Sequence, residues 1–198
     1  MKKEILVIHG GEAFDTYEQY LDFLREDELD LREVRSPRWK SRLAENLGDE
    51  YEVFTPQMPS PMNAKYAEWK IWFEKMIPQL GDGVILVGHS LGGIFLAKYL
   101  SEETFPKEIR ATILVAAVYD EEDCEPLADF VLPASLKGFA SQGGAIHLFH
   151  STDDDVVPFS HLAKFERQLP EATPHVLDGR GHFLGEQFPE IVDLLRSL

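Results

Sequence analysis

A serine lies at the centre of a G-x-S-x-G pentapeptide, Gly88–Gly92, whose flanks match those of a catalytic turn. Apolar residues rich in β-branched side chains precede it over 83–87, and helix-forming residues follow over 93–100. A strand, a sharp turn and a helix in that order expose the central hydroxyl for nucleophilic attack. Side chains at positions 88 and 92 would collide with the neighbouring strand and helix, which accounts for glycine at both. The motif predicts Ser90 as a nucleophile.

A serine hydroxyl needs a base, usually a histidine, to take its proton. Among the seven histidines of the chain, His182 has the most suitable setting, because Gly179 and Gly181 give it a loop that can reach over a site. We interpret His182 as the base. We interpret His9 and His89 as loop or turn residues. His147 and His150 are interpreted as residues on or at the end of a strand, and His161 and His175 as surface residues.

The histidine in turn needs a carboxylate that holds its tautomer. Three consecutive aspartates, residues 153–155, directly follow an apolar stretch. One of them can point at His182, while its neighbours would cap the turn or the next helix. Asp120 follows another apolar stretch and is a further candidate, although its acidic neighbours favour a solvated loop carboxylate.

Acyl transfer also needs two preorganised donors for the oxyanion that develops. One is expected to be the backbone N–H of Leu91, where the helix after the pentapeptide begins. The other is expected from the loop His9-Gly10-Gly11-Glu12, whose glycines allow the backbone to approach a substrate closely. Gly11 and Glu12 are equal candidates on the sequence alone.

Composition restricts the class of protein and its partners. The 198 residues suit one well-packed domain. The formal net charge of −16 disfavours nucleic acid and anionic membrane surfaces as partners, because both would repel it. The one cysteine, Cys124, excludes an intramolecular disulfide, and the carboxylates around it should raise the pKa of its thiol.

Neither a metal nor a cofactor is predicted. Consecutive aspartates such as 153–155 do not converge on one ion, and the glycine-rich run 88–93 lacks the Lys-Ser/Thr of a phosphate-binding loop. The N-terminal apolar run is too short for the core of a signal peptide, and no stretch approaches the length of a transmembrane helix. A cytoplasmic location is therefore expected by default.

The elements that must position these residues alternate along the chain. Six short apolar segments predict strands: 5–8, 52–55, 84–87, 111–116, 146–150 and 174–177. Apolar spacing near 3.6 residues predicts helices at 39–47, 65–80, 160–169 and 188–198. The alternation predicts a single-domain α/β fold over residues 1–198, a mostly parallel sheet of about six strands with helices on both faces. Each candidate motif then follows a strand, where such sheets bind their ligands.

Two segments exceed this minimal pattern, and each could cover the site. Residues 12–38 carry aromatic side chains among many acids, which predicts an extra amphipathic helix. Residues 119–144 begin polar and then become apolar. Neither segment is large enough for a separate cap domain. Four aromatic residues in them are candidates to line a pocket: Phe14, Tyr17, Phe130 and Phe139.

Four groups of residues carry a resemblance to a known fold family: His9-Gly10-Gly11, Gly88–Gly93, Ser151–Asp154 with Val157-Pro158, and Gly181-His182-Phe183. They resemble the motifs of the α/β-hydrolase superfamily and are spread over nearly the whole chain. More closely, the chain is similar to the small, capless serine hydrolases of the retinoblastoma-binding-protein-9 type. Residues 12–38 are longer than expected for these compact relatives, so substrate preferences are not carried over.

The resemblance also selects among the three aspartates. In this fold the acid commonly stands four residues before a proline, here Pro158, which indicates Asp154 and leaves Asp153 as the next candidate. It implies a Ser90–Asp154–His182 triad that works through an acyl-enzyme without a cofactor. The predicted activity is hydrolysis of an ester, thioester or amide of a small molecule. The alternative is a binding or interaction protein on the same scaffold with little turnover. The acyl group, the leaving group and the oligomeric state stay open.

Overall fold

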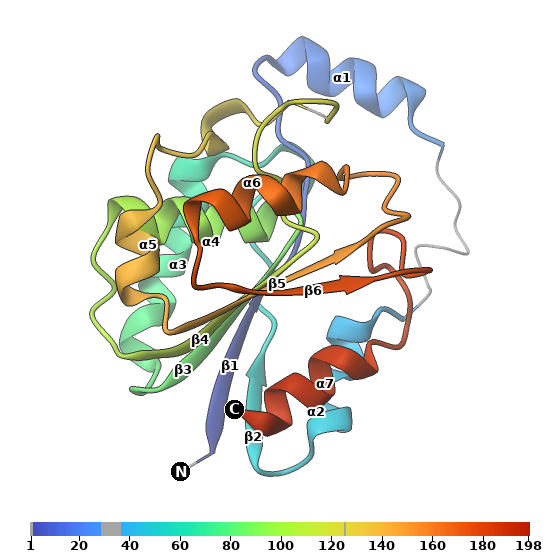
Figure 1. Ribbon diagram of the computed structural model, residues 1–198. Helices are drawn as coiled ribbons and strands as arrows, with labels where there is room; N and C mark the ends of the chain where they lie inside the picture. Colours follow the sequence, from blue (N-terminus) through green and yellow to red (C-terminus); the bar gives the residue numbers. More distant parts are fainter. Residues whose placement is uncertain (1, 29–36, 125) are drawn as a thin grey trace.

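The computed structural model describes residues 2–28, 37–124 and 126–198. Its six strands form one parallel sheet in the order β2-β1-β3-β4-β5-β6 (Figure 1). The strands are β1 (Lys3–Ile8), β2 (Tyr51–Phe54), β3 (Val84–His89), β4 (Ile109–Val115), β5 (Ala145–Ser151) and β6 (Thr173–Leu177). All six predicted strands are confirmed. Because β2 and β3 lie on opposite sides of β1, the chain changes direction there, and ligands bind beside such switch points.

Seven α-helices occur in the described residues, and they lie on both faces of the sheet, as predicted. Figure 1 shows α2 and α7 together on one side and α4 and α5 on the other. The helices are α1 (Tyr17–Glu26), α2 (Trp39–Leu47), α3 (Tyr66–Met76), α4 (Leu91–Glu102), α5 (Lys137–Gln142), α6 (Ser160–Gln168) and α7 (Pro189–Ser197). The predicted helix 65–80 ends early, because Pro78 has no N–H with which to continue the α-helical ladder.

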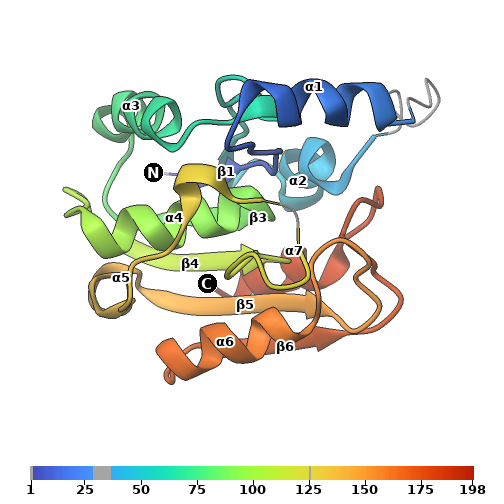
Figure 2. The ribbon, with the colours of Figure 1, turned by 90° about the horizontal axis from the view of Figure 1, so that it is seen from above.

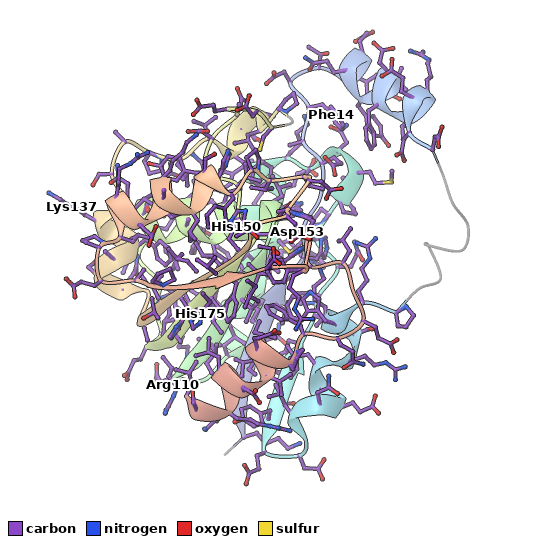
Figure 3. All side chains as sticks on the ribbon, turned by 45° about the vertical axis from the view of Figure 1, so that its right-hand side comes forward. Phe14, Arg110, Lys137, His150, Asp153 and His175 are labelled. Carbon is purple, nitrogen blue, oxygen red and sulfur yellow. The ribbon has the colours of Figure 1, made fainter. Side chains whose placement is uncertain are left out.

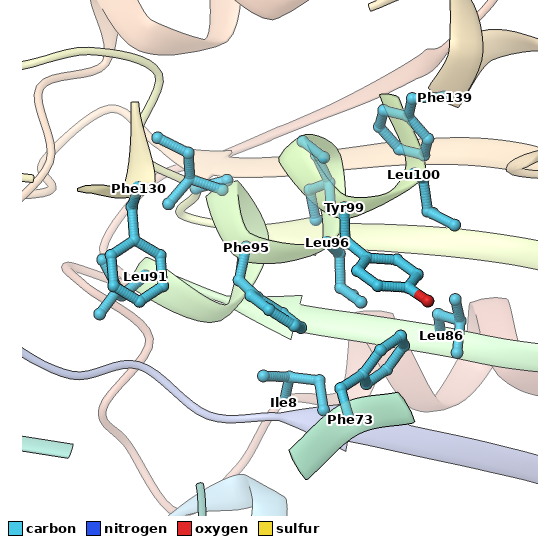
Figure 4. Packing of buried hydrophobic residues seen from close by; sticks show 14 of the residues in the cluster. Ile8, Phe73, Leu86, Leu91, Phe95, Leu96, Tyr99, Leu100, Phe130 and Phe139 are labelled. Atoms are coloured by element: carbon cyan, nitrogen blue, oxygen red, sulfur yellow. The ribbon is translucent and has the colours of Figure 1, made fainter. Parts of the chain in front are cut away.

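The strands are apolar on both faces, as buried parallel strands are. In β1, Leu6 and Ile8 belong to the core that contains α3, α4 and α6, whereas Ile5 and Val7 belong to the core that contains α2 and α7. Figure 4 shows the first of these cores, in which the Phe73 ring packs edge to face on an α4 phenylalanine. The two cores fix the strand ends, and so the loops that carry the candidate site.

Two of the four aromatic residues expected at a pocket belong to this core instead. Phe130 and Phe139 have no exposed surface (Figure 4), and Phe130 packs on Trp69 with ring centroids 5.3 Å apart. Tyr17 is 62% exposed on α1, and Phe14 is buried against the ring of an α1 phenylalanine. The prediction was wrong for Phe130 and Phe139, because an apolar run inside a long loop fills the core as readily as it lines a pocket.

The extra amphipathic helix expected within residues 12–38 is α1, which begins with a capping box between Thr16 and Gln19. None of its residues is buried. Figures 1 and 2 show it at the end of the sheet toward which the strand arrowheads point. Residues 29–36 of the expected segment lie outside the described residues.

Candidate active site

Ser90 occupies the turn between β3 and α4 in a strained backbone conformation, with φ +54° and ψ −122°. Residues other than glycine rarely adopt positive φ. The turn is held in place by a hydrogen bond of 2.9 Å from the N–H of Ser90 to the carbonyl of Val115 in β4. A Cβ at Gly88 would lie 2.5 Å from the carbonyl oxygen of Gly92, and one at Gly92 would lie 2.4 Å from that of Ile8. The collisions expected at these two positions are therefore confirmed.

His182 lies in the loop between β6 and α7, beside the turn that carries Ser90. Its Nδ1 is 3.0 and 3.1 Å from the two carboxylate oxygens of Asp154. When Nδ1–H donates to a carboxylate, Nε2 keeps its lone pair and can accept a proton. The backbone carbonyl of His182 accepts a hydrogen bond of 2.9 Å from Nε2 of His89, the residue before Ser90. These contacts bring the predicted acid and base together at the turn between β3 and α4 that carries Ser90, which is called the elbow below.

The Asp154 carboxylate is held on several sides, and its side chain has no exposed surface. Its Oδ1 accepts the backbone N–H groups of Val156 and Val157 at 3.0 and 2.9 Å. His150, at the end of β5 (Figure 3), donates from Nε2 to the carbonyl of Val157 at 2.9 Å. Burial lowers the pKa of His150, which favours the neutral form of this second imidazole beside the carboxylate. Asp154 therefore has a fixed orientation toward His182.

The two aspartates beside Asp154 have different surroundings. Asp153 (Figure 3) accepts the backbone N–H of Gly181 at 3.1 Å and the hydroxyl of Ser151. It thus fastens the loop before His182 without touching the imidazole ring. Asp155 is exposed. Of the three aspartates, Asp154 is the one that contacts the candidate base.

Asp120, the other carboxylate considered, is paired with Lys164 of α6. The ammonium lies 2.6 and 2.8 Å from its two oxygens, and 2.6 Å from a carboxylate oxygen of Glu122. Burial is the largest single influence and acts to raise the pKa of Asp120, but the hydrogen bonds from Lys164 and from the backbone of Glu122, together with the charge of Lys164, outweigh it, so that the pKa lies below its ordinary value. This ion pair ties the loop after β4 to α6.

His161 is buried, contrary to the prediction that it lies on the surface, and has no exposed area. Its Nδ1 accepts the N–H of Tyr119 at 3.0 Å, and its Nε2 donates to the carbonyl of Glu122 at 3.0 Å. The loop that covers His161 comes from a distant part of the chain, so the neighbours of His161 in sequence gave no sign of its burial.

Cys124 lies in that loop. Burial and then the carboxylate of Asp120 raise the pKa of its thiol to about 11, in the direction expected from the sequence.

The loop after β1 lies against the start of α4, where the oxyanion donors were expected. Leu91 is the first residue of α4, a position whose N–H has no partner within a helix. The N–H of Glu12 donates to the carbonyl of Pro61 at 2.8 Å. A Cβ at Gly11 would lie 2.5 Å from the same carbonyl and 3.5 Å from the Leu91 side chain. Glycine is therefore required at position 11 for this close approach.

A small, mostly apolar cavity of about 40 Å³ adjoins Ser90. Three loops and the start of α4 supply its other lining residues: Gly11, Glu12, Ala13, Leu91, Val118, Cys124, Pro126, Leu127, Val156 and Val157. A cavity measured in this way needs about 10–15 Å³ to hold one water molecule, so this one has room for about three water-sized groups. Two larger clefts, of about 410 and 490 Å³, lie away from these residues, beside β2 and beside α6.

The residues that the structure describes contain neither a cluster of metal ligands nor a helix that could span a membrane. No group of three or more histidine, cysteine, aspartate or glutamate side chains there is arranged to hold a metal ion. His147 and His175 come close, with Nδ1 of one 3.1 Å from Nε2 of the other, but they are only a pair. In the same part of the chain, no helix has both the length and the apolar character needed to cross a membrane.

A family model described as serine hydrolase matches residues 31–196. The chain belongs to the serine hydrolase family. It is 26% identical over 203 residues to "Putative hydrolase YdeN" of Bacillus subtilis (strain 168), covering 100% of this chain and 96% of the relative. The crystal structure of the ydeN gene product from B. subtilis aligns with a TM-score of 0.79 at 22% identity, over 99% of this chain and 98% of that one. An esterase from Exiguobacterium antarcticum aligns with a TM-score of 0.63 at 17% identity, over 98% and 91%.

These likenesses confirm the α/β-hydrolase fold predicted for this member of the serine hydrolase family. One neighbour of the candidate site escaped the sequence reasoning. Lys40 of α2 has its Nζ 2.9 Å from Nδ1 of His89. The apolar spacing of α2 correctly identified its buried face, but a lysine beside that face gives no signal of its partner, because His89 lies 49 residues away in sequence.

Proposed function

We propose that this protein hydrolyses an ester, thioester or amide of a small molecule through an acyl-enzyme on Ser90. The observation that carries the proposal is the strained backbone of Ser90, with φ +54°, at a turn beside the buried Asp154–His182 pair. Strain of this kind costs of order 1–3 kcal/mol per residue and persists mainly where function requires it. Membership of the serine hydrolase family supports the same activity.

In the proposed mechanism, Oγ of Ser90 attacks the carbonyl carbon while its proton passes to Nε2 of His182. Asp154 holds the imidazole tautomer and stabilises the imidazolium. The backbone N–H groups of Leu91 and Gly11 donate to the oxyanion. Collapse of the tetrahedral intermediate breaks the bond to the leaving group, which takes the proton from His182. Water then gives a proton to His182 and attacks the acyl carbon. Collapse of this second intermediate breaks the bond to Oγ of Ser90, which takes the proton back from His182 as the acid is released.

Gly11 is the proposed second oxyanion donor in preference to Glu12. The N–H of Glu12 already donates to Pro61, and a substrate oxygen would have to displace that hydrogen bond of 2.8 Å. Gly11 precedes it in the same loop, and a Cβ at this position would lie 3.5 Å from the side chain of Leu91, the residue of the other proposed donor. Preorganised donors contribute most when they need no rearrangement during the reaction.

A fluorophosphonate probe tests the nucleophile and the base together. We expect the wild-type protein to be labelled on Ser90, and His182→Ala to be labelled at least about 100-fold more slowly, because the hydroxyl loses its proton acceptor. Mass spectrometry of the labelled peptide identifies the modified residue. Ser141→Ala, at an exposed serine of α5, is the matched control and should label like the wild type. Folded protein without label on Ser90, or equal labelling of His182→Ala, would favour a binding protein instead.

The size of the cavity beside Ser90 predicts a short acyl group. With about 40 Å³ available, p-nitrophenyl acetate should fit, whereas an octanoyl chain would have to displace walls such as Leu127. We expect kcat/KM for the acetate to exceed that for the octanoate by at least about 10-fold, since even a single methylene can be worth that much in a tight pocket. Leu127→Ala should narrow the difference, and Val131→Ala, at a side chain 54% exposed, should not. A wild-type preference for octanoate would contradict this assignment.

A further inference from the structure

The first turn of α2 is fastened to the loop that carries His182. Nε1 of Trp39 donates to the carbonyl of Phe183 at 3.0 Å, and its backbone N–H donates to the carbonyl of Gly185 at 2.9 Å. One turn later, Arg42 pairs with Glu186 at 3.1 Å. α2 thus holds the chain immediately after the candidate base, from the face of the sheet that it shares with α7.

Lys40, next to Trp39, is connected to the same loop by hydrogen bonds through the imidazole of His89. Its Nζ lies 2.9 Å from Nδ1 of His89, and Nε2 of His89 lies 2.9 Å from the backbone carbonyl of His182. The two groups that flank the His89 ring, Nζ of Lys40 and the backbone carbonyl of His182, set the direction of both hydrogen bonds. A carbonyl only accepts, so Nε2 of His89 carries the proton, and the Nδ1 lone pair accepts from Lys40.

Burial fixes the charge of the central imidazole. His89 is 2% exposed, and burial, followed by the positive charge of Lys40, holds its pKa well below the ordinary value. A Cβ at Gly10 would lie 3.5 Å from Nδ1 of His89 and 3.0 Å from Cβ of Ser90, so the loop after β1 closes the other side. His89 is therefore a neutral ring with one donor and one acceptor, both engaged.

We propose that Lys40 and His89 are positioning residues that fix the backbone of His182, and through it the direction of the His182 imidazole toward Ser90. The inference rests on the proposed function of His182 as the base. Neither residue touches the acyl group in this scheme. Displacing a reacting group by about 1 Å can slow a reaction about 100-fold, so a brace at the backbone of the base acts on kcat rather than on substrate binding.

A lysine with a purely structural role would raise the free energy of unfolding, whereas the buried charge of Lys40 lowers it. Burial, together with the charge of Arg38, lowers its pKa to about 7. His9 and His89 also lie near enough for its charge to depress their pKa values. Because the folded pKa lies below that of the unfolded chain, the stability linked to this group is fully present above the ordinary lysine pKa of 10.5 and is lost progressively as the pH falls from there to about 7. Replacing Lys40 by an uncharged residue should therefore not lower the melting temperature at pH 6.

The test compares turnover and stability in matched variants. For p-nitrophenyl acetate, we expect Lys40→Met to lower kcat about 10-fold with KM within about twofold of the wild type, and to melt at pH 6 no lower than the wild type. His89→Gln keeps a donor at the position of Nε2 and should retain most of kcat, whereas the shorter His89→Asn should lose about as much as Lys40→Met. Lys98→Met is the control, because Lys98 pairs within α4 with Glu102 and should leave kcat unchanged.

Hydrogen exchange of residues 179–185 provides a readout that does not depend on turnover. We expect faster exchange of this segment in Lys40→Met than in the wild type and in Lys98→Met. Unchanged exchange together with unchanged kcat would overturn the positioning role, as would a loss of kcat matched by a fall in melting temperature. A wild-type protein that neither turns over nor labels would instead contradict the proposed function, and the exchange result would still decide whether Lys40 braces the loop.

Discussion

Asp154→Asn is expected to reduce kcat for p-nitrophenyl acetate by about 10,000-fold, the loss typical when the acid of such a triad becomes an amide. The amide can donate to Nδ1 of His182, which would then hold the lone pair and place the proton on Nε2, where the base must be free. The buried carboxylate accepts two backbone N–H groups through Oδ1, and the amide oxygen can keep both. The fold should therefore survive while the tautomer changes.

The two neighbouring aspartates provide matched controls in the same peptide. Asp155→Asn, at an exposed position, should leave kcat unchanged. Asp153→Asn removes charge from a group that accepts from Gly181 rather than from the imidazole, so we expect a loss of less than about 10-fold. If Asp153→Asn were the inactive variant and Asp154→Asn active, the acid would be misassigned by one residue.

Gly92→Ala is expected to lower the free energy of unfolding by about 3 kcal/mol. The added Cβ would lie 2.4 Å from the carbonyl oxygen of Ile8 and 2.5 Å from that of His9. Both are backbone atoms at the end of a central strand, so neither can move alone. Alanine favours helix by only about 1 kcal/mol over glycine, which is too little to offset the clash at the start of α4.

Urea denaturation measures this effect, and Gly81→Ala is the matched control. A Cβ at Gly81 would meet its nearest neighbour, the Glu4 carboxylate, at an ordinary contact distance of 3.5 Å. We expect that variant to stay within about 0.5 kcal/mol of the wild type. Equal stabilities for Gly92→Ala and the wild type would mean that the elbow can open without strain, and that its geometry is less constrained than the contact distances indicate.

Local patterns predicted the sheet and most helices because those elements are defined by residues close in sequence. The apolar run 84–87 needs only its own composition to indicate a buried strand, and β3 contains it. The contact between Asp154 and His182 also followed, because the loops after neighbouring parallel strands meet at one edge. The catalytic roles of these residues stay predictions.

The features that the sequence did not predict depend on contacts between residues distant in sequence. Lys40 contacts His89 because α2 docks on the opposite side of the sheet from α4, and no pattern around either residue records that docking. His161 is buried by a loop that begins some forty residues earlier, as its bond to Tyr119 shows. Phe130 and Phe139 fill a core whose shape exists only once α3 and α4 have packed.

The loop after β4 is anchored chiefly by α6, whereas the candidate triad is held mainly by other contacts, and this difference bears on how such a protein could diversify. Lys164 and His161 hold the loop through α6, whereas Asp154 and His182 are held by the turn after β5 and by α2. Residues of that loop, among them Leu127, line the cavity without supporting the acid or the base. Selection could therefore remodel the proposed acyl-binding wall by substitution or insertion there while leaving the proposed chemistry intact, so that close relatives could differ in substrate and share one reaction.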